Sequence, residues 1–307
     1  MAGRQQLIIA GSNKCGTTSV FRYLSEHPAV CPASRKETEF FFGEQDYASP
    51  AARAAFEALF PTLEPEHAIL VEGTPNYLDG GGAVAARMRQ VLQQPRLMFL
   101  LRDPVERFLS HYRSRQGLIG DPATELGFEA FLADQLEAAN AAAAGRTPSG
   151  RTDGHDLMKG RYVLKLREYL EIFDPDEIIV SFYEELAADS RAYMRRLCET
   201  LGVDPGYYDD FVFRVENRSR FHHSSRLRTL ATRTNLRLEP LLNRVPAARR
   251  LARAAYNAVN TSSQRGATLD AAQRAQLAEY FARPNSELRD LLTERFPHVS
   301  LPRWLAA

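Results

Sequence analysis

The chain has few cysteines and no long apolar run. Its three cysteines, Cys15, Cys31 and Cys198, are widely spaced and do not form a metal-binding pattern. A disulfide framework is therefore not expected, and a reducing compartment suits the chain. No apolar run approaches the roughly 20 residues that a transmembrane helix needs. A signal peptide is not visible either, because the apolar run at residues 7–10 is too short for one. We therefore expect a cytoplasmic protein without a transmembrane segment.

The chain also lacks a large net charge. The formal net charge is +1 at pH 7, so the protein as a whole is not a polyanion binder, and nucleic acid is not an expected partner. The charge is uneven, however, since residues 214–253 hold eleven arginines and only two acids, Glu216 and Glu239. Such a segment is typical of contact with phosphate, sulfate, an acidic glycan or an anionic lipid, and also of a solvated helical face. Both interpretations stay open.

Short apolar runs alternate with amphipathic segments along most of the chain. This alternation predicts an α/β fold in which helices flank both faces of a central parallel β-sheet. Strands are expected at residues 7–10, 68–71, 96–101 and 177–182, with a strand-like aromatic segment at 39–42. Helices are expected at residues 17–27, 51–59, 83–92, 104–115, 128–144, 159–173 and 189–201, and a polar loop at 145–154.

No composition break divides the chain. Its 307 residues suit one large α/β domain, and no internal repeat is visible. We therefore predict a single domain over residues 1–307. Residues 213–307 are expected to be its mainly helical, basic C-terminal region.

The loop after the first strand carries the strongest chemical signal. Residues 11–18 are Gly-Ser-Asn-Lys-Cys-Gly-Thr-Thr, whose two glycines and final threonine match the nucleotide-binding P-loop, G-x-x-x-x-G-K-[ST]. Glycines let backbone amides approach an anion, and the N-terminus of the next helix adds a favourable field. Thr17 stands where the P-loop has its lysine, and Lys14 lies inside the loop instead. The loop is therefore P-loop-like but a poor ATPase loop.

The arrangement resembles the 5′-phosphosulfate loop of sulfotransferases that use 3′-phosphoadenosine 5′-phosphosulfate (PAPS), in which a lysine precedes G-T-T by one residue. Residues 101–112 closely match that family's 3′-phosphate segment, R-x-P-x-x-R-x-x-S-x-Y. Two phosphate motifs about 90 residues apart, each following an apolar strand, are a much stronger signal than one loop. Residues 27–28, 36–41, 72–77, 160–162 and 178–180 also look like segments of the heparan-sulfate type, so the resemblance extends along most of the chain.

The chain departs from this pattern at two points. Gly73 stands where the family usually has a lysine, and the cysteine pair of the Golgi members is missing. Both departures concern the acceptor more than the reaction.

The resemblance implies roles for the matching residues. Lys14 would hold the sulfuryl and bridging oxygens and offset charge on the leaving phosphate. Glu37 would act as the general base, with Glu39 as its rival. The predicted cofactor-binding residues are Asn13, Lys14, Cys15, Gly16, Thr17, Thr18, Arg102, Ser110, Arg218 and Arg220. The predicted substrate-binding residues are Lys36, Glu39, Tyr77 and His222.

Simpler interpretations accompany several of these residues. Thr17 and Thr18 are also suited to cap the following helix. Arg107 suits a structural ion pair better than a direct phosphate contact. His222 lies in a basic loop, where a histidine is often incidental. Cys15 needs no role beyond fitting a tight loop.

The leading hypothesis is an enzyme that transfers a sulfuryl group from PAPS to a hydroxyl or amine of a small molecule, glycan or lipid. Its product would be 3′-phosphoadenosine 5′-phosphate (PAP), and no metal is expected. The acceptor is not identified, and an anionic or lipidic one is among the options. One alternative is a P-loop nucleotide kinase or hydrolase, against which the displaced lysine argues. The other is a non-catalytic homologue that binds an anionic ligand, against which the retained Lys14, Glu37, Arg102 and Ser110 argue.

Overall fold

The computed structural model describes residues 3–116, 121–147, 152, 154–214, 221–222, 261–262 and 267–306. The chain divides into two units, each made from separate stretches of sequence. Unit 1 contains residues 1–107, 159–216 and 278–307, and unit 2 contains residues 108–158 and 217–277. The expectation of one domain over the whole chain stays a prediction.

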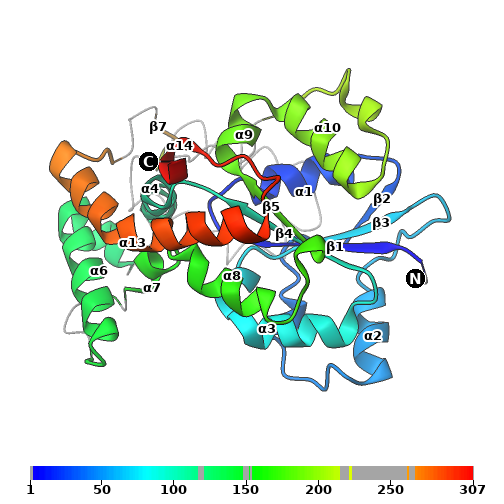
Figure 1. Cartoon of the computed structure of the whole chain (residues 1–307), viewed down its shortest axis with the longest axis horizontal. Helices are drawn as coiled ribbons and strands as arrows, with labels where there is room; N and C mark the ends of the chain where they lie inside the picture. The colour runs from blue at the N-terminus through cyan, green and yellow to red at the C-terminus, as the bar shows by residue number, and fades with distance from the viewer. Residues whose placement is uncertain are drawn as a thin grey trace, which may run out of the picture. The chain divides into compact units, whose positions relative to one another are not determined.

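Unit 1 is built on a five-stranded parallel sheet (Figure 1). The strand order is β2-β3-β1-β4-β5, which places β1 at the centre. In the register, Leu7 of β1 lies opposite Val71 of β3 and Arg96 of β4. The strands are β1 (Gln5–Gly11), β2 (Val30–Pro32), β3 (Ile69–Gly73), β4 (Pro95–Leu101) and β5 (Ile178–Phe182). The predicted α/β fold with a central parallel sheet is confirmed.

Alternate side chains of the strands enter two separate apolar cores. Ile8 and Ala10 pack in one core, while Leu7 and Ile9 pack in the other, because successive strand residues point to opposite faces. The first core includes residues of α2 (Pro50–Glu57), α3 (Tyr77–Val91), α8 (Tyr162–Leu170) and the last part of α13 (Ala271–Arg295). The second includes residues of α1 (Thr17–Ser25), α9 (Tyr183–Ala188) and α10 (Ser190–Leu201). Helices therefore cover both faces of the sheet, as predicted (Figure 1).

Unit 2 is mainly helical among its described residues. Its helices α5 (Pro122–Glu125), α6 (Gly127–Ala143) and α7 (His155–Met158) lie in sequence between α4 (Pro104–Arg115) and α8. Helices α4 and α13 contribute residues to both units. Strands β6 (Phe221–His222) and β7 (Thr261–Ser262) form a short antiparallel pair. Unit 1 also contains η2 (Pro175–Glu177), η3 (Pro205–Tyr208) and α14 (Arg303–Ala306).

The structure corrects one predicted strand. Residues 40–42 form the 3₁₀-helix η1 (Phe40–Phe42), because Glu39 has a φ of 57° and the left-handed backbone ends any extended run. The short strand β2 was not predicted. Helix α3 begins six residues earlier than expected and contains Gly81 with a φ of 55°. The predicted helix at 159–173 is shorter and corresponds to α8.

The C-terminal prediction is tested only in part. Helices α13 and α14 agree with a mainly helical region. Most of the arginine-rich segment at 214–253 lies outside the described residues. In the portion of the chain covered by the structure, no helix is both long enough and apolar enough to cross a membrane.

Candidate active site

The P-loop-like segment joins the central strand β1 to helix α1. Gly16 is the residue before α1 and has a φ of 91°, a conformation that favours glycine. A Cβ at this position would also lie 2.9 Å from Cδ2 of Tyr183. Gly16 provides no side-chain cap, so the first-turn amides of α1 are suited to bind an anion. Neither Thr17 nor Thr18 is the cap, because Gly16 occupies that position.

Lys14 brings the two phosphate motifs together. Its carbonyl oxygen accepts a hydrogen bond from Nη1 of Arg102 at 3.4 Å. Burial lowers the pKa of Lys14, the charge of Arg102 lowers it further, and the charge of Glu37 opposes this decrease. Arg102 and Glu37 are therefore each close enough to Lys14 to affect its charge. The catalytic roles of Lys14 and Glu37 stay predictions.

Arg102 is held by two tyrosines. Its carbonyl oxygen accepts a hydrogen bond from the Tyr162 hydroxyl at 2.9 Å. Its guanidinium carbon lies 4.5 Å from the centre of the Tyr183 ring, a distance suited to a cation–π contact. Tyr183 was not predicted as a site residue from the sequence. Its position directly after β5, at the carboxyl end of a parallel strand, was the available signal.

The Cys15 side chain packs beneath the loop. It is fully buried, and its sulfur lies 3.9 Å from the Tyr162 hydroxyl. Burial raises the pKa of the Cys15 thiol to about 11, although the charge of Arg107 acts in the opposite direction. Arg107 is itself fully buried, in agreement with a structural role. At neutral pH Cys15 is a neutral thiol, so any cofactor contact would come from its backbone.

The predicted base lies on a turn between β2 and η1. Glu37 and its rival Glu39 both have positive φ values, 61° and 57°. The Glu37 amide donates to the carbonyl oxygen of Gly73 at 2.9 Å, which ties the turn to β3. The Glu37 side chain is 54% exposed and forms an ion pair with Lys36. The charge of Glu37 acts on the pKa of Lys14, and the choice of Glu37 over Glu39 as the base stays a prediction.

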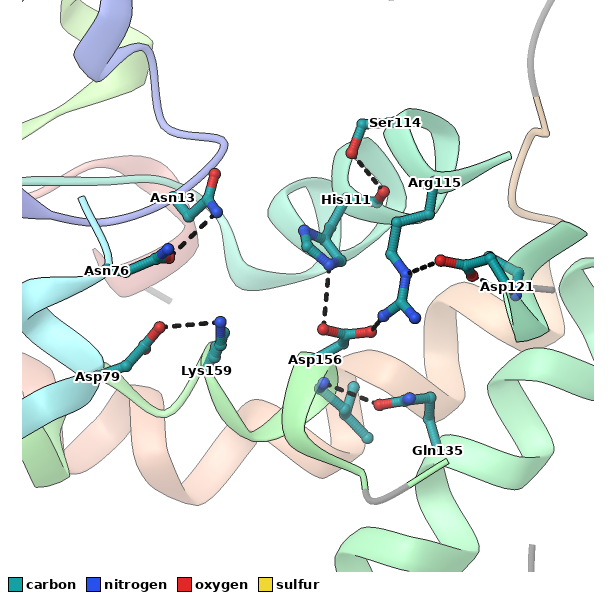
Figure 2. Close-up of polar contacts among 12 residues, drawn as sticks. Asn13, Asn76, Asp79, His111, Ser114, Arg115, Asp121, Gln135, Asp156 and Lys159 are labelled. Atoms are coloured by element: carbon teal, nitrogen blue, oxygen red, sulfur yellow. Dashed lines mark hydrogen bonds and ion pairs between the residues drawn. The ribbon is translucent and has the colours of Figure 1, made fainter. Parts of the chain in front are cut away.

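One polar pair links the P-loop-like segment to the start of α3, and a second links α3 to the segment before α8 (Figure 2). Nδ2 of Asn13 donates to Oδ1 of Asn76 at 3.3 Å. Asp79 and Lys159 form a half-buried ion pair at 3.0 Å. The sequence analysis predicted Asn13 but neither Asp79 nor Lys159. No motif singled out these last two residues, which come together only through folding.

Tyr77 occupies a core position. Its side chain is fully buried, and its hydroxyl accepts a hydrogen bond from the Phe41 amide at 3.3 Å. Burial raises the pKa of Tyr77. A direct contact with an acceptor therefore finds no support in its position.

Ser110 lies on the part of α4 that belongs to unit 2. A polar network surrounds this helix: His111 pairs with Asp156 at 3.0 Å, and Arg115 pairs with Asp156 and with Asp121 (Figure 2). The Leu157 amide donates to Oε1 of Gln135 at 3.1 Å, which connects α7 to α6. The network fixes α4 within unit 2. It does not test the predicted phosphate contact of Ser110.

Three predicted residues lie wholly or partly outside the described residues. Arg218 and Arg220 lie outside the described residues. His222 has a described backbone, which pairs with Thr261 in the short antiparallel sheet, but no described side chain. No cluster of three or more metal-ligating side chains is found among the described residues.

Similar proteins come from one family. The family model for the sulfotransferase domain matches residues 84–237, half of the chain. The membrane-associated sulfotransferase kil1 of Dictyostelium discoideum is 35% identical over 135 residues, which cover 42% of this chain and 28% of the relative. The bifunctional heparan sulfate N-deacetylase/N-sulfotransferase 2 of Bos taurus is 26% identical over 208 residues, covering 65% of this chain and 22% of the relative. The chain thus spans about a quarter of the length of these relatives.

A solved structure shares the fold. The sulfotransferase from Alicyclobacillus acidocaldarius superposes with a TM-score of 0.62 and 22% identity, covering 98% of both chains. This likeness concerns the fold alone, whereas the family model matches the sequence itself. The matched residues include Arg102 and Ser110 of the second motif. The chain therefore belongs to the sulfotransferase domain family.

Proposed function

We propose that this protein is an enzyme that transfers a sulfuryl group from PAPS to a hydroxyl or amine of an acceptor. The observation that carries this proposal is the hydrogen bond from Arg102 to the Lys14 carbonyl, which joins the loop after β1 to the residue after β4. Glu37 is tied to the end of the neighbouring strand β3 through the Gly73 carbonyl. Two cations beside a helix N-terminus that has no side-chain cap suit a polyanion, and a carboxylate close to Lys14 suits a base. Family membership supports the same chemistry.

The residues present fit the donor. Because Arg102 lowers the pKa of Lys14 by charge repulsion, an anion bound between the two would be favoured electrostatically. Lys14 and the loop residues Asn13, Cys15, Gly16, Thr17 and Thr18 would hold the phosphosulfate end. Arg102 and Ser110 would hold the 3′-phosphate, and we also assign Arg218 and Arg220 to the cofactor. When bound, PAPS supplies the sulfuryl group, and PAP is the product that leaves.

Different residues of the chain would carry out the proton transfer and the stabilisation of charge. The Glu37 carboxylate would take the proton that the acceptor hydroxyl or amine must lose. The Lys36 ammonium, which pairs with this carboxylate, lies beside it. The Lys14 ammonium would stabilise the negative charge that develops on the leaving oxygen. Lys36, Glu39 and His222 remain proposals for acceptor contact.

The acceptor class and the cellular location are proposals as well. Some of the relatives carry names that refer to heparan sulfate, and a glycan hydroxyl or amine is therefore a first class to test beside small molecules and lipids. We propose a cytoplasmic location, although the relative kil1 is named as membrane-associated. Incubating the protein with ³⁵S-labelled PAPS and an extract of the source cell would identify the labelled acceptor, and fractionation would locate the protein.

Nucleotide binding provides the first test. PAP should raise the melting temperature much more than AMP, because only PAP offers a phosphate to Arg102 and Ser110. Arg102→Ala should weaken PAP binding by about 2–4 kcal/mol, the scale for truncating one member of a buried charged pair. Arg53→Ala, an exposed arginine on α2, is the matched control and should not change PAP binding. Differential scanning fluorimetry and calorimetry measure both effects.

The same titration separates the alternatives. Equal shifts with PAP and AMP would contradict the 3′-phosphate site. A larger shift with ATP and magnesium than with PAP would favour a kinase or nucleotide hydrolase. PAP binding without any labelled product in the extract would favour a non-catalytic homologue.

A further inference from the structure

Glu72 is a buried carboxyl group that the proposed chemistry does not use. It lies near the carboxyl end of β3 and is 0% exposed. Its Oε1 accepts three hydrogen bonds: from the Thr38 amide at 3.3 Å, from the Thr38 hydroxyl at 2.9 Å and from the Thr74 hydroxyl at 2.6 Å. A buried polar group with several partners is costly to disturb and orders its surroundings.

These hydrogen bonds converge on the turn that carries the proposed base. Thr38 stands between Glu37 and Glu39, both of which have left-handed backbones that side chains other than glycine rarely adopt. The Thr74 hydroxyl, which donates to Glu72, also accepts from the Glu39 amide at 3.3 Å. A strained turn persists only where surrounding contacts hold it in place. Glu72 makes or supports the contacts of both Thr38 and Glu39.

We propose that Glu72 is a positioning residue that holds the strained turn at residues 37–39 and so presents Glu37 toward Lys14. It acts through Thr38 and Thr74 and does not touch the acceptor or the cofactor. This inference rests on the proposed sulfuryl transfer, because it assigns Glu37 the role of base. The structure of the turn itself does not depend on that role.

The contacts of Glu72 indicate that it works as an acceptor and not through its charge. Its Oε2 is buried and has no hydrogen-bond partner among the described residues, so a proton there would leave Oε1 free to accept. Burial raises the pKa of Glu72, while the hydrogen bonds of Thr74 and Thr38 and the charge of Lys36 oppose this increase. The charge of Glu72 in turn raises the pKa of Tyr77, so these two titratable groups also lie close together. Glutamine at this position would keep the accepting oxygen.

Four variants test the inference. Glu72→Ala removes the acceptor, and Glu72→Gln retains it. Thr38→Val removes one donor while keeping the shape of the side chain, which keeps the proposal testable if Glu72→Ala does not fold. Val71→Ala is the matched control, because Val71 is a buried neighbour on β3 that packs in the other core.

The readouts are amide hydrogen exchange in the peptide covering residues 36–41, PAP affinity, and single-turnover transfer from ³⁵S-labelled PAPS to the acceptor isolated from the extract. In Glu72→Ala and Thr38→Val, exchange of the turn amides should accelerate at least about 10-fold and transfer should slow by roughly 10–100-fold, with PAP affinity within about twofold. Glu72→Gln should stay within about threefold of the wild type. Val71→Ala should lower the melting temperature without changing the turn amides or transfer.

Unchanged exchange and transfer in both Glu72→Ala and Thr38→Val would overturn the inference. If Glu72→Gln behaves like Glu72→Ala, the claim that Glu72 acts as a neutral acceptor is wrong. A wild-type protein that neither binds PAP nor transfers sulfuryl would instead refute the proposed function, and the exchange measurement would still decide whether Glu72 holds the turn.

Discussion

At the scale of single residues, the charged form of Lys14 is disfavoured by its surroundings. Lys14 is half-buried, has a φ of 69°, and its pKa is lowered first by burial and then by Arg102. The unfolded chain therefore binds this proton more tightly than the folded protein does. The resulting destabilisation is present below the folded pKa and is relieved as pH rises toward 10.5, the ordinary value. The proposed binding of an anion by Lys14 would offset this destabilisation.

Replacing this cation should separate stability from binding. Lys14→Met keeps the length of the side chain and removes its charge, so the free protein should gain roughly 0.5–1 kcal/mol, or about 1–4 °C in melting temperature. The further increase that PAP causes should become smaller. Scanning fluorimetry with and without PAP measures both effects. If Lys14→Met melts at a lower temperature than the wild type in the absence of PAP, the charge of Lys14 does not destabilise the fold.

At the scale of elements, the hydrogen bonding of helix α3 is interrupted at Gly81, and a side chain of the neighbouring helix α8 accepts a hydrogen bond from the next backbone amide. Gly81 leaves the helical conformation, and the Gly82 amide donates to Oε2 of Glu168 on α8 at 2.8 Å. Burial alone would raise the pKa of Glu168, but the hydrogen bonds from Lys165 and from the Gly82 amide outweigh it, so the pKa is lowered. Glu168 therefore stabilises the fold above its ordinary pKa of 4.5, and this contribution is lost as pH falls through its lower folded pKa.

The hydrogen bond between the Gly82 amide and Glu168 leads to a prediction. Glu168→Ala should destabilise the protein by about 0.5–1 kcal/mol at pH 7, since a charged hydrogen bond to a partly exposed carboxylate is weakened by solvent. The difference from the wild type should disappear well below pH 4.5, where Glu168 is protonated in both states. Urea denaturation at the two pH values is the measurement. Glu171→Ala, on the exposed side just beyond α8, is the control. A loss that persists in acid would point to packing instead.

Elements with strong local patterns were predictable from the sequence, and elements that depend on tertiary contacts were not. Strands β1, β3, β4 and β5 are continuous apolar runs because both faces of a parallel sheet are buried. The three-residue strand β2 is too short for such a pattern. The aromatic run at residues 40–42 resembled a strand, but its backbone follows the left-handed Glu39 and its rings pack in an aromatic cluster.

The residues of the candidate site also fall into those with a local sequence signal and those whose contacts depend on folding. Lys14 and Arg102 lie in motifs whose spacing carries the signal. The contacts of Tyr183 with Arg102 and of Glu72 with Thr38 join residues that are distant in the sequence, so these contacts could not be predicted from local patterns.

At the scale of the whole molecule, buried thiols and phenols make the fold sensitive to alkali. Burial raises the pKa of Cys15 to about 11, and burial with nearby acidic groups raises that of Cys198 to about 12, against an ordinary value of 9.0. Each thiol therefore contributes stability that is complete below pH 9 and is lost as pH rises through its folded pKa. Buried tyrosines such as Tyr162 and Tyr193 act in the same direction at still higher pH.

The thiol contribution can be isolated. As pH rises from 8 to 10.5, the free energy of unfolding should fall by about 2 kcal/mol for each of these thiols, because the thiols ionise at a lower pH in the unfolded chain. The variant that carries both Cys15→Ala and Cys198→Ala should start from a lower stability and show a shallower decline. Urea denaturation over this range gives the slope. A double variant with the same slope as the wild type would rule out the thiols as its source.

The first core contains residues that are synthesised long after the strands they pack against, and this order matters during translation. Leu288, Leu292 and Phe296 pack in the same core as Ile8 and Leu70, yet they follow β5 by about 100 residues. At a synthesis rate of roughly 5–20 residues per second, that apolar layer waits about 5–20 s for its last residues. During this interval the nascent chain offers a surface that chaperones or other chains can bind. Pausing translation before residue 288 should therefore increase aggregation of the nascent chain more than pausing before residue 178, when less of the apolar layer has been made.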